Sequence, residues 1–264
     1  MSSLTTVTTP TRLDDSHFQA DIPDGWQQGR GAFGGLVVGN LVRAIEAFDG
    51  APALSLRALT AELCGPVLPG PALITATRLR TGTGVSTIAV ALEQGGEILA
   101  HAVGVRGKTR SEDTDFSHVQ APLLPPWRSV EPIVVAPPLG PVFAANFEFR
   151  VSGPPPFSSS EAVASGWIRP RDPGPARDAA FIAACADVFW PAVMARLAGP
   201  RPLATIAFTL EIVGDLVGLD PEAPLYHTSR SLLSRGGYAL ETRELWGEDG
   251  RLVSRNHQTA VIIK

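Results

Sequence analysis

The chain repeats one order of elements, a long apolar helix followed by four strand-like segments, and this repeat constrains its fold more than any other feature. The first helix is expected over residues 35–48. The second is expected from Asp178 to Leu197, with Asp178 as N-cap and with Pro191 either kinking the helix or ending its regular part. Length and β-branched content predict strands over 54–63, 72–79, 85–94 and 98–105, and again over 204–213, 225–232, 238–246 and 252–263.

Two short stretches also match between the halves. Thr60-Ala-Glu-Leu63 parallels Thr209-Leu-Glu-Ile212, and Gln94-Gly-Gly-Glu-Ile98 parallels Glu248-Asp-Gly-Arg-Leu252, so the two pairs are separated by nearly the same length of chain. So long a period indicates a duplicated domain and not a solenoid. A helix packed on an antiparallel sheet is an α+β unit. We therefore expect a double hotdog, in which two antiparallel sheets each wrap a long helix and join edge to edge into one continuous sheet.

Proline marks the boundary between the two units. Between residues 108 and 143 there are prolines at 122, 125, 126, 132, 137, 138 and 141. Proline at this density neither continues a helix nor donates to a sheet. The predicted organisation is an N-terminal hotdog over 1–107, a proline-rich connector over 108–143, which Trp127 anchors to a surface, and a C-terminal hotdog over 144–264.

Composition excludes several partners. The 264 residues carry 22 basic and 26 acidic side chains, a net charge of −4, without a Lys/Arg-rich run, so no nucleic-acid partner is expected. No apolar stretch approaches the length of a membrane span, and the first ten residues lack the features of a signal peptide. Cys64 and Cys185 lie in apolar segments, which predicts buried thiols and a cytoplasmic location.

Common catalytic motifs are missing from the sequence. It contains no Gly-x-Ser-x-Gly elbow and no His-Glu-x-x-His pair, and its five histidines lack metal-ligand spacing, so no metal is expected. Gly29–Gly34 matches the dinucleotide pattern, but a polar, broken segment precedes it where that fold needs a buried strand, so no cofactor is expected. Gly34 and Gly35 instead open the first helix. Their N–H groups could polarise a thioester carbonyl or hold a phosphate, or the glycines could simply allow close packing.

Several motifs resemble those of one family. Ala32–Leu41 resembles the helix-opening motif of the acyl-CoA thioesterase II (TesB-like) family, and Gly166-Trp-Ile-Arg169 resembles its Trp-x-Arg strand. Phe181–Phe189 resembles the family's second helix, and the last strand ends in a similar His257-Gln258. The resemblance covers residues 18–107 and 144–264 in order. It implies the hydrolysis of an acyl-CoA to a free acid and CoA.

In that family an Asp, a Ser or Thr and a Gln position the attacking water. The resemblance places the Gln at Gln258, the hydroxyl at Ser231 or Thr228, and the Asp at Ala207, which predicts weakened hydrolysis. Asp187 on the second helix could supply a base, or it could hydrogen-bond a strand end or a helix terminus. Glu211 shares a face with Ala207 but lies about 13 Å along the strand, too far to replace the missing acid.

The implied substrate site joins the two hotdogs. Gly34 and Gly35 would face the strand of Gln258, and Arg80 and Arg235 are candidates to bind the CoA phosphates. Self-association into a homo-oligomer through the exposed sheet surface is implied as well. A non-catalytic acyl-CoA or acyl-carrier binding protein is the alternative function. A hotdog hydratase is disfavoured, because the chain lacks the Asp-x4-His spacing that those enzymes use.

Overall fold

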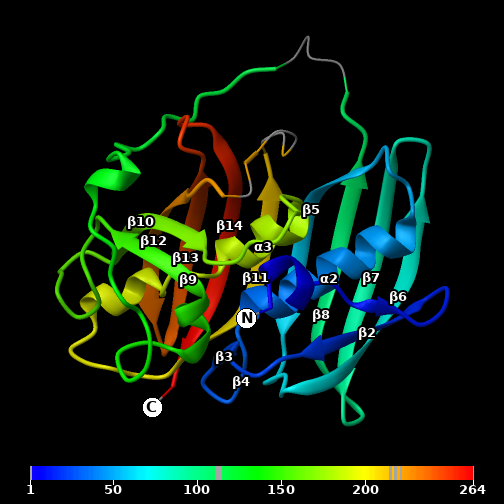
Figure 1. The fold of residues 1–264 in the computed structure, drawn as a ribbon, viewed down its shortest axis with the longest axis horizontal. Helices are drawn as coiled ribbons and strands as arrows, with labels where there is room; N and C mark the ends of the chain where they lie inside the picture. Colours follow the sequence, from blue (N-terminus) through cyan, green and yellow to red (C-terminus); the bar gives the residue numbers. More distant parts are fainter. Residues whose placement is uncertain (1, 111–114, 214–215, 217–218, 221, 264) are drawn as a thin grey trace.

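One antiparallel sheet of twelve strands curves around two helices (Figure 1). The structure is a computed structural model that describes residues 2–110, 115–213, 216, 219–220 and 222–263. The strand order is β1-β2-β6-β7-β8-β5-β11-β14-β13-β12-β10-β9, so the two halves meet where β5 pairs with β11. The predicted α+β double hotdog is therefore confirmed, including its continuous sheet.

The helices and strands follow the predicted order, with a few additions. The N-terminal half contains α1 (Leu4–Val7), β1 (Thr11–Arg12), β2 (His17–Ile22), β3 (Gln27–Gln28), β4 (Gly31–Ala32), α2 (Gly34–Asp49), β5 (Ser55–Leu63), β6 (Gly70–Thr81), β7 (Val85–Gln94) and β8 (Glu97–Gly107). The C-terminal half contains β9 (Phe147–Val151), β10 (Val163–Pro170), α3 (Ala179–Ala186), β11 (Leu203–Ile212), β12 (Leu225–Arg235), β13 (Tyr238–Trp246) and β14 (Leu252–Ile262). Short 3₁₀ helices cover Trp127–Ser129, Val142–Asn146 and Ala192–Arg196.

The irregularities of the sheet are duplicated along with its strands. The register of β5 shifts between Leu56 and Ala58, and that of β11 shifts at the equivalent place, between Thr205 and Ala207. The register of β6 shifts after Arg78, and that of its counterpart β12 shifts after Ser231. A β-bulge is a specific local feature. Its recurrence at equivalent positions supports a duplication more strongly than the element order does.

Helix α3 is shorter than predicted. Its N-cap is Asp178 as expected, because the Asp178 side chain accepts from the Phe181 N–H at 2.9 Å. The helix ends at Ala186, with Asp187 as C-cap, and Pro191 precedes a 3₁₀ turn instead of kinking the helix. Arg43 of α2 forms an ion pair with Asp178 at 2.6 Å, so the two helices lie antiparallel, each with its start near the other's later turns.

The connector is anchored as predicted. Trp127 is buried against Trp167, Tyr226 and Trp246 on the outer side of the C-terminal sheet. The Arg150 guanidinium lies 4.1 Å from the centre of the Trp127 ring, and Trp167 donates to the Pro125 carbonyl at 2.8 Å. The proposed domain boundaries at 107 and 143 remain a prediction.

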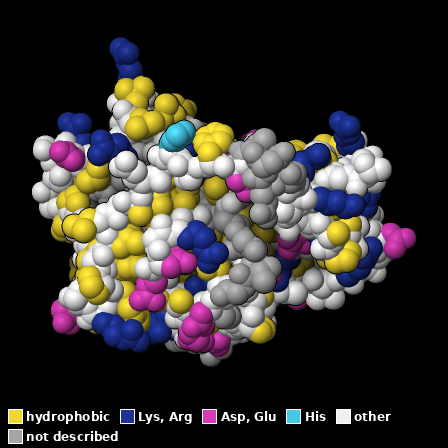
Figure 2. Space-filling view, turned by 90° about the horizontal axis from the view of Figure 1, so that it is seen from above, with side chains coloured by type: hydrophobic (Ala, Val, Ile, Leu, Met, Phe, Trp, Pro, Cys, Tyr) yellow, Lys and Arg dark blue, Asp and Glu magenta, His cyan; other side chains and the backbone are white. Residues whose placement is uncertain are grey.

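The cysteine prediction is half right. Cys185 is buried, and burial raises the pKa of its thiol to about 12, whereas Cys64 is exposed where the chain leaves β5. Among the described residues, no helix is both long and apolar enough to cross a membrane. Basic and acidic side chains are interspersed on the face seen in Figure 2, and no single-sign field covers it.

Candidate active site

The start of α2 faces the end of α3, and an acid lies between them. Phe33, the N-cap of α2, makes no side-chain cap, so the first N–H groups of the helix are available to other partners. Asp187 occupies that place: the Gly35 N–H donates to its carboxylate. A Cβ added to Gly34 would lie 2.6 Å from Asp187 Oδ2. Glycine is therefore required here for the close approach of the carboxylate to the helix.

Gln258 of β14 holds this carboxylate from the sheet side. Its Nε2 donates to Asp187 Oδ1 and to Asn256 Oδ1, each at 2.9 Å. Asn256 in turn donates to the Thr209 carbonyl at 2.8 Å, which fixes which way its own amide points. Both N–H groups of the Gln258 amide are thus used, and one of them is directed at the acid.

Thr205 of β11 completes the network. Its Oγ1 donates to Gln258 Oε1 at 2.9 Å, which fixes the remaining end of the amide. The bulge at Ile206 makes this contact possible. Thr205 pairs with Ala260 and Phe208 with Gln258, so both side chains face the helices although their positions differ by three. Strict alternation would have turned Thr205 outward.

A buried ion pair lies behind the acid. Arg243 Nε donates to Glu241 Oε1 at 2.8 Å, while its Nη1 is 3.6 Å from Asp187 Oδ1 and also donates to the carbonyls of Ala186 and Phe189 at the end of α3. Arg243 is closer to Glu241 than to Asp187, so its main ion pair is with Glu241. Burial raises the pKa of Asp187 above its ordinary value of 3.8, and Arg243, Gln258 and the Gly35 N–H only partly offset this effect. A carboxylate with a raised pKa is a better base.

The structure overturns the expected position of the family acid. Ala207 pairs with Thr259 on β14 and with Glu62 on β5, and the Glu62 side chain is exposed. Since Gln258 faces the helices, its neighbour Thr259 and the paired Ala207 face outward. Ala207 is therefore not at the site, and the expectation of weakened hydrolysis loses its basis. Asp187 lies beside Gln258, and its carboxylate accepts from the Gly35 N–H at the start of α2, which is one of its two predicted uses. The other use, as a base, stays a prediction.

Neither predicted hydroxyl meets Gln258. Thr228 pairs with Glu244 and lies between the buried, inward-facing His227 and Ser229, so it faces outward. Ser231 pairs with Glu241, two strands away from Gln258, and its Oγ donates to the Leu240 carbonyl at 3.2 Å. The prediction missed Thr205 because its inward direction depends on a bulge, and a bulge leaves no periodic pattern in the sequence.

The two predicted phosphate-binding arginines also face away from the site. Arg80 pairs with Thr87, whose neighbour Ser86 points inward to Asp49, so Arg80 lies on the outer face. Arg235 pairs with the exposed Tyr238 and lies with it on the outer face of the sheet. Neither side chain is placed to contact a ligand bound between α2 and β14. Of the predicted site residues, the structure brings together Gly34, Gly35, Asp187 and Gln258.

The N-terminal half has no polar side chains at the positions equivalent to Thr205 and Gln258. The shared bulge places Leu56 at the position equivalent to Thr205, and the matched strands β8 and β14 place Gly104 at the position equivalent to Gln258. A Cβ on Gly104 would lie 2.8 Å from Ile45 Cδ1 and 3.3 Å from Leu56 Cδ1, so apolar side chains fill this space. The hydrogen-bonded residues Thr205, Gln258 and Asp187 all lie in the C-terminal half.

Comparison with protein families decides the class of this chain. Residues 22–107 match the model of the acyl-CoA thioesterase N-terminal domain, and residues 119–262 match that of the C-terminal domain. The chain belongs to the acyl-CoA thioesterase family. It is thus a thioester hydrolase with a double-hotdog fold, and acyl-CoA is its substrate class.

Solved structures share the whole fold of this thioesterase. A hot dog fold protein of unknown function from Alicyclobacillus acidocaldarius is 24% identical with a TM-score of 0.89, over 100% of this chain and 99% of that one. A candidate thioesterase II from Thermobifida fusca YX is 22% identical with a TM-score of 0.86, over 100% and 98%. A tesB protein of Mycobacterium avium subs paratuberculosis is 19% identical with a TM-score of 0.81, over 99% and 98%. No curated protein matches the chain significantly.

Proposed function

We propose that this thioesterase hydrolyses acyl-CoA with Asp187 as general base, and with Gln258 and Thr205 as the residues that position it. The observation that carries the proposal is the continuous set of hydrogen bonds from Thr205 through Gln258 to Asp187, beside the start of α2. Every polar group in this set has a defined partner. Such a set fixes the direction of the carboxylate before substrate binds.

The proposed reaction adds one water across the thioester. Asp187 takes a proton as the water oxygen attacks the carbonyl carbon, and the carbonyl becomes an oxyanion. The tetrahedral intermediate collapses with loss of the CoA thiolate, and the proton on Asp187 is passed to the sulfur. A raised pKa suits both steps, because the same group must accept and then release a proton near neutral pH.

The start of α2 is proposed to stabilise the oxyanion. The Gly34 N–H donates to no other described group, and the Gly35 N–H is already used by Asp187. The positive end of the helix dipole adds to the same effect. Base and oxyanion donor then come from the facing ends of two antiparallel helices, and Gln258 joins them to the sheet.

A thiol-release assay on acyl-CoAs of increasing chain length tests this function. We expect hydrolysis by the wild type, and a fall of about 10²–10⁴-fold in kcat for Gln258→Ala, because the base then loses its fixed direction. Gln94→Ala, at the end of β7, is the matched control amide and should keep the wild-type rate. Tight binding of acyl-CoA without any thiol release would support the non-catalytic binding protein instead.

Self-association is proposed through the outer face of the sheet. Its central strands present half-buried small and apolar side chains there, among them Ala58, Ala89, Ala91 and Val103. Light scattering should give a multiple of the mass of one chain, and a particle with the mass of a single chain would count against the proposal. The cytoplasmic location is proposed on the same footing and rests on the two free cysteines.

A further inference from the structure

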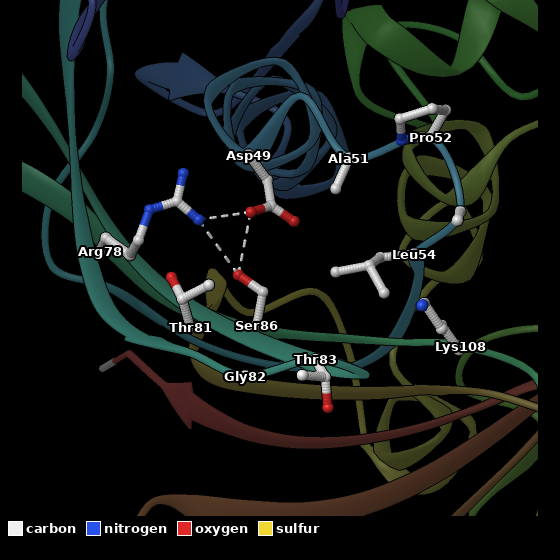
Figure 3. Close-up of a pocket in the computed structure, with 11 residues that line it drawn as sticks. Asp49, Ala51, Pro52, Leu54, Arg78, Thr81, Gly82, Thr83, Ser86 and Lys108 are labelled. Carbon is white, nitrogen blue, oxygen red and sulfur yellow. Dashed lines mark hydrogen bonds and ion pairs between the residues drawn. The ribbon is translucent and has the colours of Figure 1, made fainter.

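A polar cleft lies at the opposite end of α2 from Asp187. It has a volume of about 560 Å³, within the range of small-molecule sites. The sixteen residues of α2 span about 24 Å, so the cleft is well separated from the proposed catalytic acid. Figure 3 shows Asp49, the last residue of α2, at its back wall.

The carboxylate of Asp49 in this cleft accepts three hydrogen bonds from neighbouring side chains. Asp49 Oδ1 accepts from Arg78 Nη1 at 2.5 Å and from Ser86 Oγ at 3.0 Å, and Asp49 Oδ2 accepts from Arg106 Nη1 at 2.7 Å. The carboxylate is almost fully buried, and these partners, acting against burial, hold its pKa below 3.8. It stays ionised, and both of its oxygens already accept from side chains that line the end of α2. Its charge is more than balanced by the two arginines.

The groups that remain in the cleft are donors. Arg78 Nε and Nη2 have no partner among the described residues, and the guanidinium lies 5.0 Å from the centre of the Phe48 ring, which supports its orientation. Lys108 is exposed at the other end of the cleft, and the hydroxyls of Thr81 and Thr83 lie along its edge. In Figure 3 the cations lie on opposite sides of an apolar strip that includes Ala51 and Leu54.

We propose that this cleft binds a small molecule that carries an oxyanion on a compact apolar body. The oxyanion contacts the Arg78 fork, and the body lies against the strip from Ala51 to Leu54, with the Lys108 ammonium at the far end of the cleft. The shared chemistry is the oxyanion, which occurs on phosphate esters and on carboxylic acids. Two cations at its ends favour the phosphate ester, because it carries the larger negative charge.

Calorimetric titration of the full chain with butyl phosphate and with pentanoate tests the site, since the two probes have similar apolar chains. We expect saturable binding at millimolar concentration or below, weakened at least about tenfold in Arg78→Gln and by a smaller factor in Lys108→Gln, which removes a more distant charge. Arg80→Gln is the matched control, because Arg80 lies on the same strand but faces the other side of the sheet. Tighter binding of pentanoate would assign the site to carboxylic acids.

Two results would overturn the proposal. One is the absence of saturable binding for both probes. The other is equal weakening in Arg78→Gln and Arg80→Gln, which indicates non-specific attraction of anions. Both cleft variants should fold, since Asp49 keeps Arg106 and Ser86 without Arg78, and Lys108 is exposed. A thermal unfolding curve for each variant checks this directly.

Discussion

Replacing Gly34 with alanine is expected to lower kcat/KM by about 10²-fold and to leave stability almost unchanged. The added Cβ would lie 2.6 Å from Asp187 Oδ2 and 3.0 Å from Leu63 Cδ1, where ordinary contact begins near 3.4 Å. The carboxylate must therefore retreat by roughly 0.8 Å, which breaks the geometry of its 2.9 Å bond to Gln258. A misplacement of about 1 Å at a catalytic group costs on the order of 10²-fold in rate.

The effect on stability is smaller because two terms oppose each other. Alanine in a helix is favoured over glycine by about 0.5–1 kcal/mol, which offsets the crowding at the end of a movable side chain. We expect the free energy of unfolding to change by less than about 1 kcal/mol, measured by denaturant titration.

Gly199→Ala is the matched control for this substitution. Nothing lies within 4 Å of a Cβ at that position, and its backbone is not left-handed, so kcat/KM should stay at the wild-type value. Thiol release from one acyl-CoA measures all three proteins. The reasoning is wrong if Gly34→Ala keeps kcat/KM within about twofold of the wild type while folding normally.

Three further predictions concern the same network. Thr205→Val should lower kcat by about tenfold and keep the melting temperature, because Gln258 loses only one of its anchors; an unchanged kcat would remove Thr205 from the site. Arg243→Met should lower the free energy of unfolding by about 3–5 kcal/mol in a denaturant titration, since Glu241 is left buried without its cation, and Glu241→Gln in the same chain should recover part of the loss. The kcat of the wild type should rise with pH through an apparent pKa above 3.8, because the base must be deprotonated. The pKa of Asp187 is higher in the folded than in the unfolded protein. Its contribution to stability therefore falls as pH increases from the unfolded-state pKa through the folded-state pKa. A kcat that is flat from pH 4 to 8 would argue against this carboxyl as base.

Periodic features of the chain were predictable. The β-branched segments and the apolar helix of residues 34–49 lie within a few residues of their expected bounds, because each buries one continuous face. The duplication followed from matched element order and local sequence. The early end of α3 at Asp187 was not predictable from periodicity, since the residues after it remain apolar and buried.

The polar centre of the site could be predicted only in part. Gly34 and Gly35 were predicted from the free N–H groups at the start of the first helix, Gln258 from a family resemblance, and Asp187 from its place on the second helix. Thr205 was missed because the resemblance placed the hydroxyl on β12, and because only the bulge at Ile206 turns Thr205 toward Gln258. The extra residue, Ile206, thus turns Thr205 inward, where strict alternation would have turned it outward. The same bulge occurs at Arg57 in the other half. The direction of a side chain near a bulge is thus set by the pairing of two strands, which the sequence of one strand does not show.

The comparison of Asp187→Asn with Ala207→Asp tests the central claim most directly. Asparagine is nearly isosteric and can keep a hydrogen bond to Gln258, but it cannot accept the proton of water, so kcat should fall by about 10²–10⁴-fold. An acid at residue 207 would face the outer side of the sheet and should leave kcat at the wild-type value. A wild-type rate in Asp187→Asn, or a large increase in Ala207→Asp, would contradict the account and return the catalytic acid to β11.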